Sequence, residues 1–345
     1  MQTAGFDFDL PGDRIAQHPA NPRDAARLLH VAAVGLHDRT VRDLPDLLHP
    51  GDMIVVNDTR VIPAQLVAWR GTARVGITLD RPDAHGNWHA LARNARRLRS
   101  GDTLTFQGHN TLTATVVQGN KCGSVTLLFN LAGEEFARAL HAAGALALPP
   151  YIARAEGVTA NDHADYQTVF ATNPGAVASP TAGLHFTPQL LEQLTARGIG
   201  RATVTLHVGA GTFLPMRTEN VAMHRMHAER GHIDAASAAA INQARAAGGR
   251  ILAVGTTTLR LLESAVQPDG TIAPFAGETS IFIIPGMSVR SADLLLTNFH
   301  LPRSTLFMLV CAFAGMDRMK AAYAHAIASK YRFFSFGDAT LLERA

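Results

Sequence analysis

Met53-Ile54-Val55-Val56-Asn57-Asp58-Thr59-Arg60 is the segment that most strongly indicates how the chain folds. Its first four residues are apolar, they follow Pro50-Gly51-Asp52, and they give way to four polar residues. This is the pattern of a short buried strand. From residue 61 to Asn130 the sequence pattern differs from the pattern on either side. One structural unit is therefore interrupted there by another.

Residues 61–130 consist of short runs of β-forming residues separated by turn residues such as Gly71, Gly101 and Gly108. The runs are 61–69, 74–80, 88–92, 103–106, 111–117 and 124–129. Six short strands without a helical period predict a small antiparallel β-barrel or sandwich. We expect residues 61–130 to form an inserted β-barrel domain.

The segments on either side of the insertion alternate helical and strand patterns. Helices are expected at 134–143, 187–197, 235–247, 256 onward, 304–313 and 317–329, and strands at 202–208, 251–254, 281–284 and 294–296. Thr187 is the expected N-cap of the second helix, with Pro188 in its first position. This pattern predicts a mixed α/β body, a discontinuous domain of residues 1–60 and 131–345.

Charge is divided unevenly between these two parts. The 345 residues carry a formal net charge of +3. Residues 60–130 hold nine basic and three acidic side chains, a local +6, which leaves about −3 for the rest of the chain. A basic module on a slightly acidic body is typical of a protein that meets phosphate groups.

Cysteine content and hydropathy indicate the compartment. Cys122 and Cys311 lie far apart in apolar settings, which fits a reducing environment rather than a disulfide framework. The N-terminus carries Asp7 and Asp9 and does not resemble a signal peptide. The most apolar run, residues 305–314, is half of the roughly 20 residues that a bilayer requires. We expect a soluble cytoplasmic protein.

Polar and glycine-rich clusters recur where predicted strands end, which is where α/β folds bind ligands. They are residues 180–186 (with Thr181, Gly183 and His185), 205–213 (with His207, Gly209, Gly211 and Thr212), 255–260 (with Thr256 and Thr257), 297–304 (with Asn298 and His300) and 330–338 (with Tyr331 and Arg332). Each also has a plain structural interpretation. The glycines form turns, one threonine caps a helix, His300 is a hydrogen-bonded structural histidine, and the aromatic C-terminal segment is a strand packed on the core.

Two further side-chain groups have competing interpretations. His224, His227 and Glu229 lack the spacing of a known zinc site, and we expect no metal there. The cluster of Arg93, Arg96, Arg97 and Arg99 is either a solvated face or a contact surface for a polyanion.

The sequences and the order of several motifs closely resemble those of one family, the S-adenosylmethionine:tRNA ribosyltransferase-isomerases of queuosine biosynthesis. The motifs lie at residues 57–64, 148–152, 165–169, 174–186, 204–213, 255–257, 297–302 and 331–334. The chain departs from the family pattern at Gln65, Ser179, Arg230 and Phe336. The resemblance covers nearly the whole chain.

The resemblance implies that the ribosyl part of S-adenosylmethionine, a co-substrate, is transferred and isomerised onto 7-aminomethyl-7-deazaguanine at the wobble position of tRNA. Epoxyqueuosine-tRNA forms, and adenine and methionine leave. The sulfonium acidifies the ribose C5′ protons, so a general base must reach them, and a general acid assists adenine departure. The scheme requires no metal, and nothing in the sequence demands a partner subunit, so we expect a monomer.

The resemblance also assigns roles to residues. His207, His185 and Glu229 are the candidate acids and bases, because imidazoles and perturbed carboxylates titrate near neutral pH. The co-substrate is assigned to Thr181, Gly183, Gly209, Gly211, Thr212, Thr256 and Thr257, and the tRNA to Asn57, Asp58, Arg60, Arg96, Arg97, Asn298, His300, Tyr331 and Arg332.

Two other functional classes stay open at this point. A non-catalytic RNA-binding protein would bind tRNA without releasing adenine. A methyltransferase, suggested by the Gly-X-Gly turn at residues 209–211, would release S-adenosylhomocysteine. For such an enzyme Glu229 is only a weak candidate for the acidic residue that holds the ribose.

Overall fold

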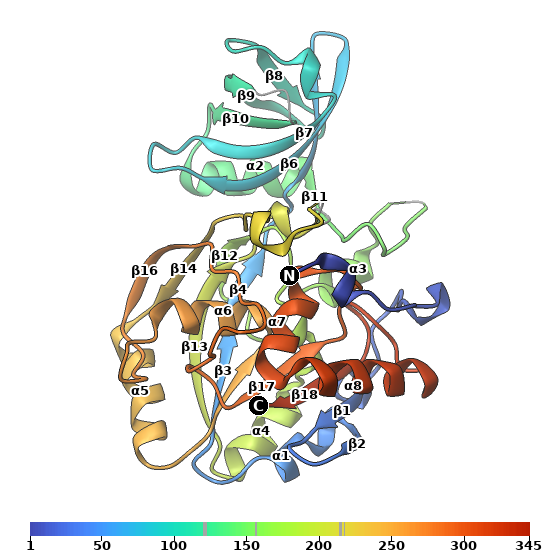
Figure 1. Cartoon of the computed structure of the whole chain (residues 1–345). Helices are drawn as coiled ribbons and strands as arrows, with labels where there is room; N and C mark the ends of the chain where they lie inside the picture. Colours follow the sequence, from blue (N-terminus) through green and yellow to red (C-terminus); the bar gives the residue numbers. More distant parts are fainter. Residues whose placement is uncertain (120–122, 156, 214–215, 217) are drawn as a thin grey trace.

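The computed structural model describes residues 1–119, 123–155, 157–213, 216 and 218–345. A β-barrel stands above a larger body built on a mixed sheet (Figure 1). This confirms the predicted α/β body with an inserted antiparallel barrel.

The body contains a nine-stranded sheet. In spatial order its strands are β16 (Phe275–Thr279), β14 (Glu229–Ile233), β13 (Gly200–His207), β3 (Met53–Asn57), β15 (Ile251–Val254), β17 (Leu294–Asn298), β18 (Ala339–Glu343), β1 (Arg27–Val31) and β2 (Leu36–Thr40). The four central strands β13, β3, β15 and β17 run parallel. The opening motif is therefore the middle of the sheet, and its apolar residues are buried on both faces.

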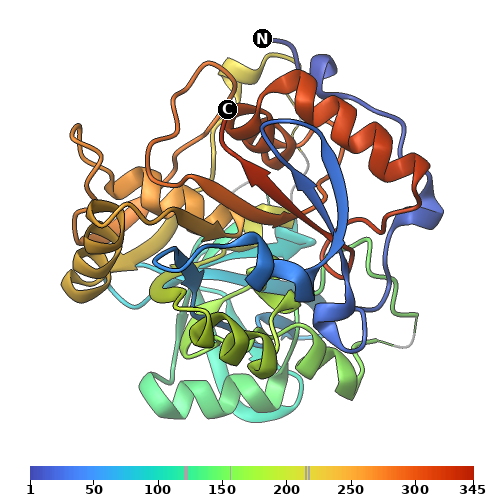
Figure 2. The ribbon, with the colours of Figure 1, turned by 90° about the horizontal axis from the view of Figure 1, so that it is seen from below.

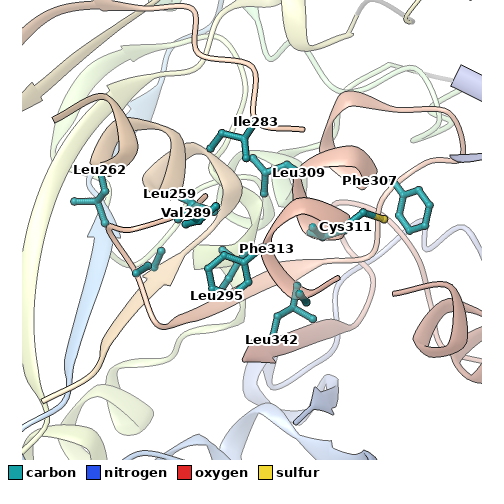
Figure 3. Close-up of a cluster of buried hydrophobic side chains, with 14 of the residues drawn as sticks. Leu259, Leu262, Ile283, Val289, Leu295, Phe307, Leu309, Cys311, Phe313 and Leu342 are labelled. Atoms are coloured by element: carbon teal, nitrogen blue, oxygen red, sulfur yellow. The ribbon is translucent and has the colours of Figure 1, made fainter. Parts of the chain in front are cut away.

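Helices cover both faces of the sheet, and strand alternation explains how. Val55 packs in the cluster that contains Leu259 and Phe307, whereas its neighbours Ile54 and Val56 pack in the cluster that contains Leu190. The helices are α1 (Leu44–Leu47), α3 (Ala160–Asp165), α4 (Pro188–Ala196), α5 (Ala235–Ala246), α6 (Thr256–Ala265), α7 (Thr305–Ala314) and α8 (Met316–Ala328). Figure 2 shows the red helices α7 and α8 on one side of the sheet and the yellow-green α4 on the other. Figure 3 shows side chains of α6 and α7 meeting Leu295 and Leu342 of the sheet.

Short 3-10 helices connect these elements. They are η1 (Thr3–Phe6), η2 (Gly12–Arg14), η3 (Arg23–Ala25), η4 (Val41–Asp43), η5 (Ala95–Arg97), η6 (Thr181–His185), η7 (Ala210–Phe213) and η8 (Val221–Met223). The predicted cap of α4 is confirmed, because the Thr187 hydroxyl oxygen accepts the Leu190 N–H at 3.1 Å. Ser304 caps α7 in the same way, accepting from Phe307 N at 3.1 Å.

The barrel confirms all six predicted strands. They are β5 (Gln65–Arg70), β6 (Ala73–Pro82), β7 (Trp88–Arg93), β8 (Thr103–Phe106), β9 (His109–Gly119) and β10 (Ser124–Phe129). Pairing of β5 with β8, in which Ala68 lies opposite Phe106, closes the sheet into a ring. Closure removes the exposed edges that an open sheet would leave.

Helix α2 (Gly133–Ala143) packs on the barrel core, whereas we expected residues from 131 onward to belong to the body. Its apolar side includes Phe136, whose ring centroid lies 4.8 Å from that of Phe129 and 5.6 Å from that of Trp88. The short strand β11 (Gly144–Ala145) then pairs with β5. The amphipathic helix thus covers barrel side chains that would otherwise be exposed.

Two expectations in the body were wrong. Residues 281–284 form no strand, although Ile283 is buried, and the edge strand β16 lies just before them. The segment 330–338 is irregular and is buried apart from Lys330 and Arg332, and the strand β18 follows it. In the described residues no helix is both long and apolar enough to span a membrane.

Candidate active site at the strand ends

The carboxyl ends of the four parallel strands meet at the edge of the sheet that faces the barrel (Figure 1). In the register, Val204 of β13 lies beside Asn57 of β3, and Val254 of β15 beside Leu296 of β17. His207, Gly255 and Asn298 therefore come to one edge. The sequence placed candidate residues at each of these strand ends, and the topology brings them together.

His207 is held by a small two-stranded sheet of β4 (Thr59–Val61) and β12 (Asn173–Ala176). Its ring Nδ1 lies 2.8 Å from the Thr59 hydroxyl oxygen. Gly175, at φ +152°, packs on the ring so closely that a Cβ there would lie 2.8 Å from the Nδ1 and Cε1 atoms. Burial, followed by the nearby Arg230, lowers the pKa of His207, and Asp58 opposes them. The imidazole is therefore neutral at neutral pH.

Asp58 lies beside this histidine in a network of short hydrogen bonds. One carboxylate oxygen accepts from the Thr205 hydroxyl at 2.7 Å, and the other from the Asn173 side-chain amide at 3.0 Å. Half-buried Asp58 and exposed Arg60 lie where the body joins the insertion. Asn57 is buried instead, and its amide makes hydrogen bonds with the backbone of Leu206 and Thr59. This corrects the expected contact of Asn57 with the substrate, because its polar atoms brace the two strands.

The backbone of the turn after His207 donates hydrogen bonds to two carboxylates from different parts of the molecule. Glu229 of β14 accepts from Gly209 N at 3.3 Å, and Asp80 of the barrel strand β6 accepts from Ala210 N at 2.7 Å. A Cβ at position 209 would lie 2.5 Å from Asp80 Oδ1. We expected these N–H groups to be free for a ligand. In the structure Asp80 and Glu229 occupy them, and Asp80 ties the barrel to the body.

Glu229 also forms a buried ion pair with Arg260 of α6. Arg260 Nη1 donates to Glu229, and Arg260 Nε donates to the Ile281 carbonyl at 3.2 Å. The remaining terminal nitrogen, Nη2, has no hydrogen-bond partner among the described residues. A buried pair of this kind fixes geometry rather than adding net stability.

Glycine and threonine candidates line the rest of the turn region. A Cβ at Gly211 would lie 2.5 Å from the exposed His227 ring, so the glycine permits this close packing. Thr212 next to it is exposed. The carboxylate of Glu229 is committed to Arg260 and Gly209, away from the His224 and His227 pair. Across the described ranges no three His, Cys, Asp or Glu side chains are grouped to hold a metal ion.

A second polar cluster joins η6 to the end of β17. The Thr181 hydroxyl donates to the Asn298 side-chain oxygen at 2.9 Å, and the Asn298 amide lies 3.2 Å from His185 Nε2. Burial, followed by the charges of Arg332 and Arg23, lowers the pKa of His185 to about 3. His185 is therefore a neutral hydrogen-bonding group at working pH.

The N-terminus of α6 lies near this cluster. Gly255 precedes it at φ +94°, and a Cβ there would lie 3.5 Å from Ala182 of η6. Thr256 is buried and Thr257 is half-buried, while the Thr258 hydroxyl donates a hydrogen bond to the Val254 carbonyl at 2.8 Å. Gly183 of η6 packs against Thr168, whose methyl carbon would lie 3.0 Å from a Cβ at position 183.

The profile of the family described as queuosine biosynthesis protein matches residues 3–342. The chain belongs to this family. A protein named S-adenosylmethionine:tRNA ribosyltransferase-isomerase from Gluconacetobacter diazotrophicus is 66% identical over 99% of this chain and 96% of its own length. One of the same name from Acidiphilium cryptum is 60% identical over all of both chains. A crystal structure of S-adenosylmethionine tRNA ribosyltransferase from Thermotoga maritima covers 98% of this chain and 99% of its own, with 34% identity and a TM-score of 0.56.

Several residues expected at the tRNA surface of this queuosine-family chain are buried. Tyr331 is fully buried, its hydroxyl donates to Asp38, and the Arg27 guanidinium lies 3.6 Å from its ring centroid. This corrects the expected stacking of Tyr331 on tRNA bases, because neither face is free. His300 is buried with Nε2 3.1 Å from the Thr297 hydroxyl, and burial lowers its pKa to about 3. It fits the structural alternative.

The remaining tRNA candidates differ in accessibility. Arg332 pairs with Asp338 at 3.0 Å, and its side chain stays 37% exposed. Arg96 is exposed on η5 of the barrel. Arg97 ends η5, and its side chain lies outside the described part of the structure.

Four residues that shape the site were not singled out from the sequence for these roles: Thr59, Gly175, Asp80 and Arg260. Thr59, Gly175 and Arg260 lie inside motifs that the sequence did single out. Their roles depend on contacts between distant segments, which those motifs do not reveal. Asp80 ends a predicted barrel strand, and its only sequence signal is that it is one of three acidic residues in the basic insertion.

Proposed function

We propose that this chain is an S-adenosylmethionine:tRNA ribosyltransferase-isomerase. The observation that carries this proposal is full-length identity of 60% or more to proteins of that name. The proposed reaction moves the ribosyl group of S-adenosylmethionine onto the aminomethyl group of a 7-deazaguanine at the wobble position of tRNA. Adenine and methionine leave, and epoxyqueuosine-tRNA is the product.

His207 is the proposed general base. It is neutral at working pH, it lies at the strand-end edge, and its Nδ1 is already engaged by Thr59, which leaves Nε2 for the substrate. Removal of a C5′ proton leaves an electron pair on the carbon next to the sulfonium. General base catalysis of this kind contributes roughly 10²- to 10⁴-fold in rate.

Two carboxylates lie at the turn to which we assign the cationic co-substrate. Asp80 and Glu229 both reach the backbone at residues 209–210. Asp80 Oδ2 forms an ion pair with Arg81 at 2.8 Å, and 16% of the Asp80 side chain remains exposed. We assign the sulfonium to this region, and the adenosine and methionine portions to Thr181, Gly183, Gly211, Thr212, Thr256 and Thr257. His185 and Asn298 supply hydrogen bonds there, and the scheme requires no metal.

The tRNA is assigned to the barrel and to its junction with the body. Arg96, with Arg97 beside it, meets the phosphate backbone, and Arg60 and Asp58 meet the modified base or its phosphate. Arg332 is the exposed candidate on the body side. A monomer is sufficient for this arrangement, since both parts of the proposed site come from one chain.

Product analysis tests the proposal. The protein is incubated with S-adenosylmethionine and tRNA that carries 7-aminomethyl-7-deazaguanine, and the small molecules are identified by mass spectrometry. We expect equimolar adenine and methionine together with epoxyqueuosine in the tRNA. S-adenosylhomocysteine would instead indicate a methyltransferase, and tRNA binding without any product would indicate a binding protein; either result would overturn the proposal.

A matched pair of variants links the reaction to the site. His207→Gln removes the proposed base, and we expect turnover to fall by about 10²-fold or more. Arg201→Ala, on the exposed start of the same strand and at the opposite edge of the sheet, serves as the control and keeps its turnover. Equal turnover in the two variants would remove His207 from the mechanism.

A further inference from the structure

The Thr59 hydroxyl lies between two partners that make different demands on it. Its oxygen is 2.8 Å from His207 Nδ1 and 3.4 Å from the Asn173 carbonyl oxygen. A hydroxyl has one proton to donate, and a carbonyl oxygen accepts only. Both contacts are hydrogen bonds when the Thr59 proton points to Asn173 and Nδ1 carries a proton that it donates to Thr59.

We propose that Thr59 is a positioning residue that holds His207 in the tautomer protonated at Nδ1, so that Nε2 keeps the lone pair. This inference rests on the proposed function, because it names the residue that prepares the base of that reaction. Two neutral tautomers of imidazole are close in energy, so the partner of one nitrogen decides which is populated. Only the Nδ1-protonated form presents a basic nitrogen at Nε2.

The surroundings of His207 make this single contact decisive. Thr59 is fully buried, so water does not compete for its hydroxyl. Gly175 packs on the ring and leaves no room for even a methyl group, which limits rotation of the imidazole. Thr59 and Asn173 are directly paired in the β4–β12 sheet, so the Asn173 carbonyl is held in register with the Thr59 hydroxyl.

The charged groups around the ring do not replace Thr59 in this role. Arg230 lies opposite His207 on β14, and Asp58 precedes Thr59 on the chain. The carboxylate of Asp58 is occupied by Thr205 and Asn173, and Arg60 donates to the Thr172 carbonyl. Asp80 and Glu229 bind the turn after His207 rather than its ring. Among these groups Arg230 and Asp58 shift the pKa of the imidazole, whereas Thr59 contacts a ring nitrogen.

The proton transfer then balances without rearrangement of the ring. Nε2 of neutral His207 accepts the C5′ proton, and the electron pair of the C–H bond stays on the carbon beside the sulfonium. The imidazolium that forms keeps its Nδ1–H bond to Thr59. In the opposite tautomer Nε2 would carry a proton already and could not accept another.

Two substitutions separate positioning from packing. Thr59→Val keeps the shape and removes the hydroxyl, and Thr59→Ser keeps the hydroxyl and removes a methyl group. We expect Thr59→Val to lower kcat about 10- to 100-fold with little change in KM, the range seen on loss of groups that orient metal-binding imidazoles. We expect Thr59→Ser to stay within about 3-fold of the unsubstituted enzyme. Equal losses in both variants would indicate packing and overturn the proposal.

Nitrogen NMR of the histidine side chains tests the tautomer without any assay of turnover. The 15N-labelled full-length protein is compared with His207→Gln to assign the two ring nitrogens of His207. We expect Nδ1 to be protonated and Nε2 to be unprotonated in the unsubstituted protein. Thr205→Val, which removes a neighbouring hydroxyl that contacts Asp58, should keep this tautomer, and Thr59→Val should lose it. A proton on Nε2 in the unsubstituted protein would overturn the proposal, even if Thr59→Val failed to fold. If the enzyme released no adenine but showed the Nδ1 tautomer, the proposed function would fail and the assignment of Thr59 as the group that sets the tautomer would stand.

Discussion

At the scale of single residues, His207 responds to two opposite charges. Burial and Arg230 lower its pKa, and Asp58 raises it. A base must be neutral, so kcat/KM is full above this pKa and is lost as the pH falls through it. We predict that Arg230→Gln moves the acid limb of the profile to higher pH and that Asp58→Asn moves it to lower pH. The pH dependence of kcat/KM in the two variants checks the signs, and shifts in the same direction would contradict the assignment.

The buried pair of Glu229 and Arg260 predicts a stability effect. Glu229→Gln removes the charge that compensates a buried guanidinium, so we expect a loss of about 3 to 5 kcal/mol in the free energy of unfolding. Glu134→Gln breaks the exposed pair with Arg138 on α2, and we expect a change of at most about 0.5 kcal/mol. Urea unfolding of both variants measures the contrast. Similar values for the two would mean that the Glu229 carboxylate is solvated.

The sequence located the candidate site more reliably than it assigned its atoms. Strand-end motifs brought His207, His185 and Asn298 into consideration, and the parallel register explains why they share an edge. The same motifs gave no sign that Tyr331 and Asn57 are buried, because aromatic and amide side chains occur both in cores and at nucleic-acid surfaces. Gly209 was expected to donate to a ligand, but its N–H donates to Glu229, and Asp80, from a segment 129 positions away along the chain, packs against it.

At the scale of elements, short runs with turn residues on both sides were predicted well. The six barrel strands and the cap of α4 follow from local chemistry, and they are found where expected. Residues 281–284 show why apolarity alone misleads: Ile283 is buried and its three neighbours are half-buried against the core, and the Ile281 carbonyl accepts from Arg260 rather than from a neighbouring strand. The adjacent β16, Phe275–Thr279, is mostly exposed and contains Gly277 and Glu278. Both residue types are uncommon in strands, so the sequence did not predict this one.

Helix α2 predicts a local effect on the barrel. Phe136→Ala removes the ring that packs on Phe129 and Trp88, and we expect the barrel to lose about 3 to 5 kcal/mol. Both tryptophans, Trp69 and Trp88, lie in barrel strands, so their fluorescence reports this unit.

Phe170→Ala is the matched control for that experiment. Phe170 is equally buried, but it packs on Phe186 in the body. We expect Phe136→Ala to lower the midpoint of the fluorescence transition and Phe170→Ala to lower mainly the circular dichroism transition. If both variants shift both signals together, barrel and body unfold as one unit and α2 has no separate role.

At the scale of the whole molecule, the charge division predicts where tRNA binds. Arg96 is exposed in the segment with a local charge of +6. We predict that Arg96→Ala weakens tRNA binding and reduces the slope of log K against log salt by about 1, because one phosphate contact is lost. Fluorescence anisotropy over a salt series measures both quantities.

Arg201→Ala removes the same charge from the far edge of the sheet and isolates the position from the net charge. We expect its affinity and slope to match those of the unsubstituted protein. If Arg96→Ala were equally silent, the arginine cluster of the barrel would be a solvated face, and tRNA would have to approach the body directly.

The insertion also sets the order in which the molecule is built on the ribosome. Barrel strands find all their partners within residues 65–145, so this unit completes early in synthesis. Strand β3 must wait for β13 and β15, and β1 pairs with β18 only when residues 339–342 have emerged. At about 5–20 residues per second, β3 waits roughly 7 to 30 seconds for β13, and β1, which pairs early with β2, waits roughly 15 to 60 seconds for β18. During that interval the nascent chain carries a finished barrel between apolar strands with open edges, so chaperone capture should concentrate on the body and spare the insertion.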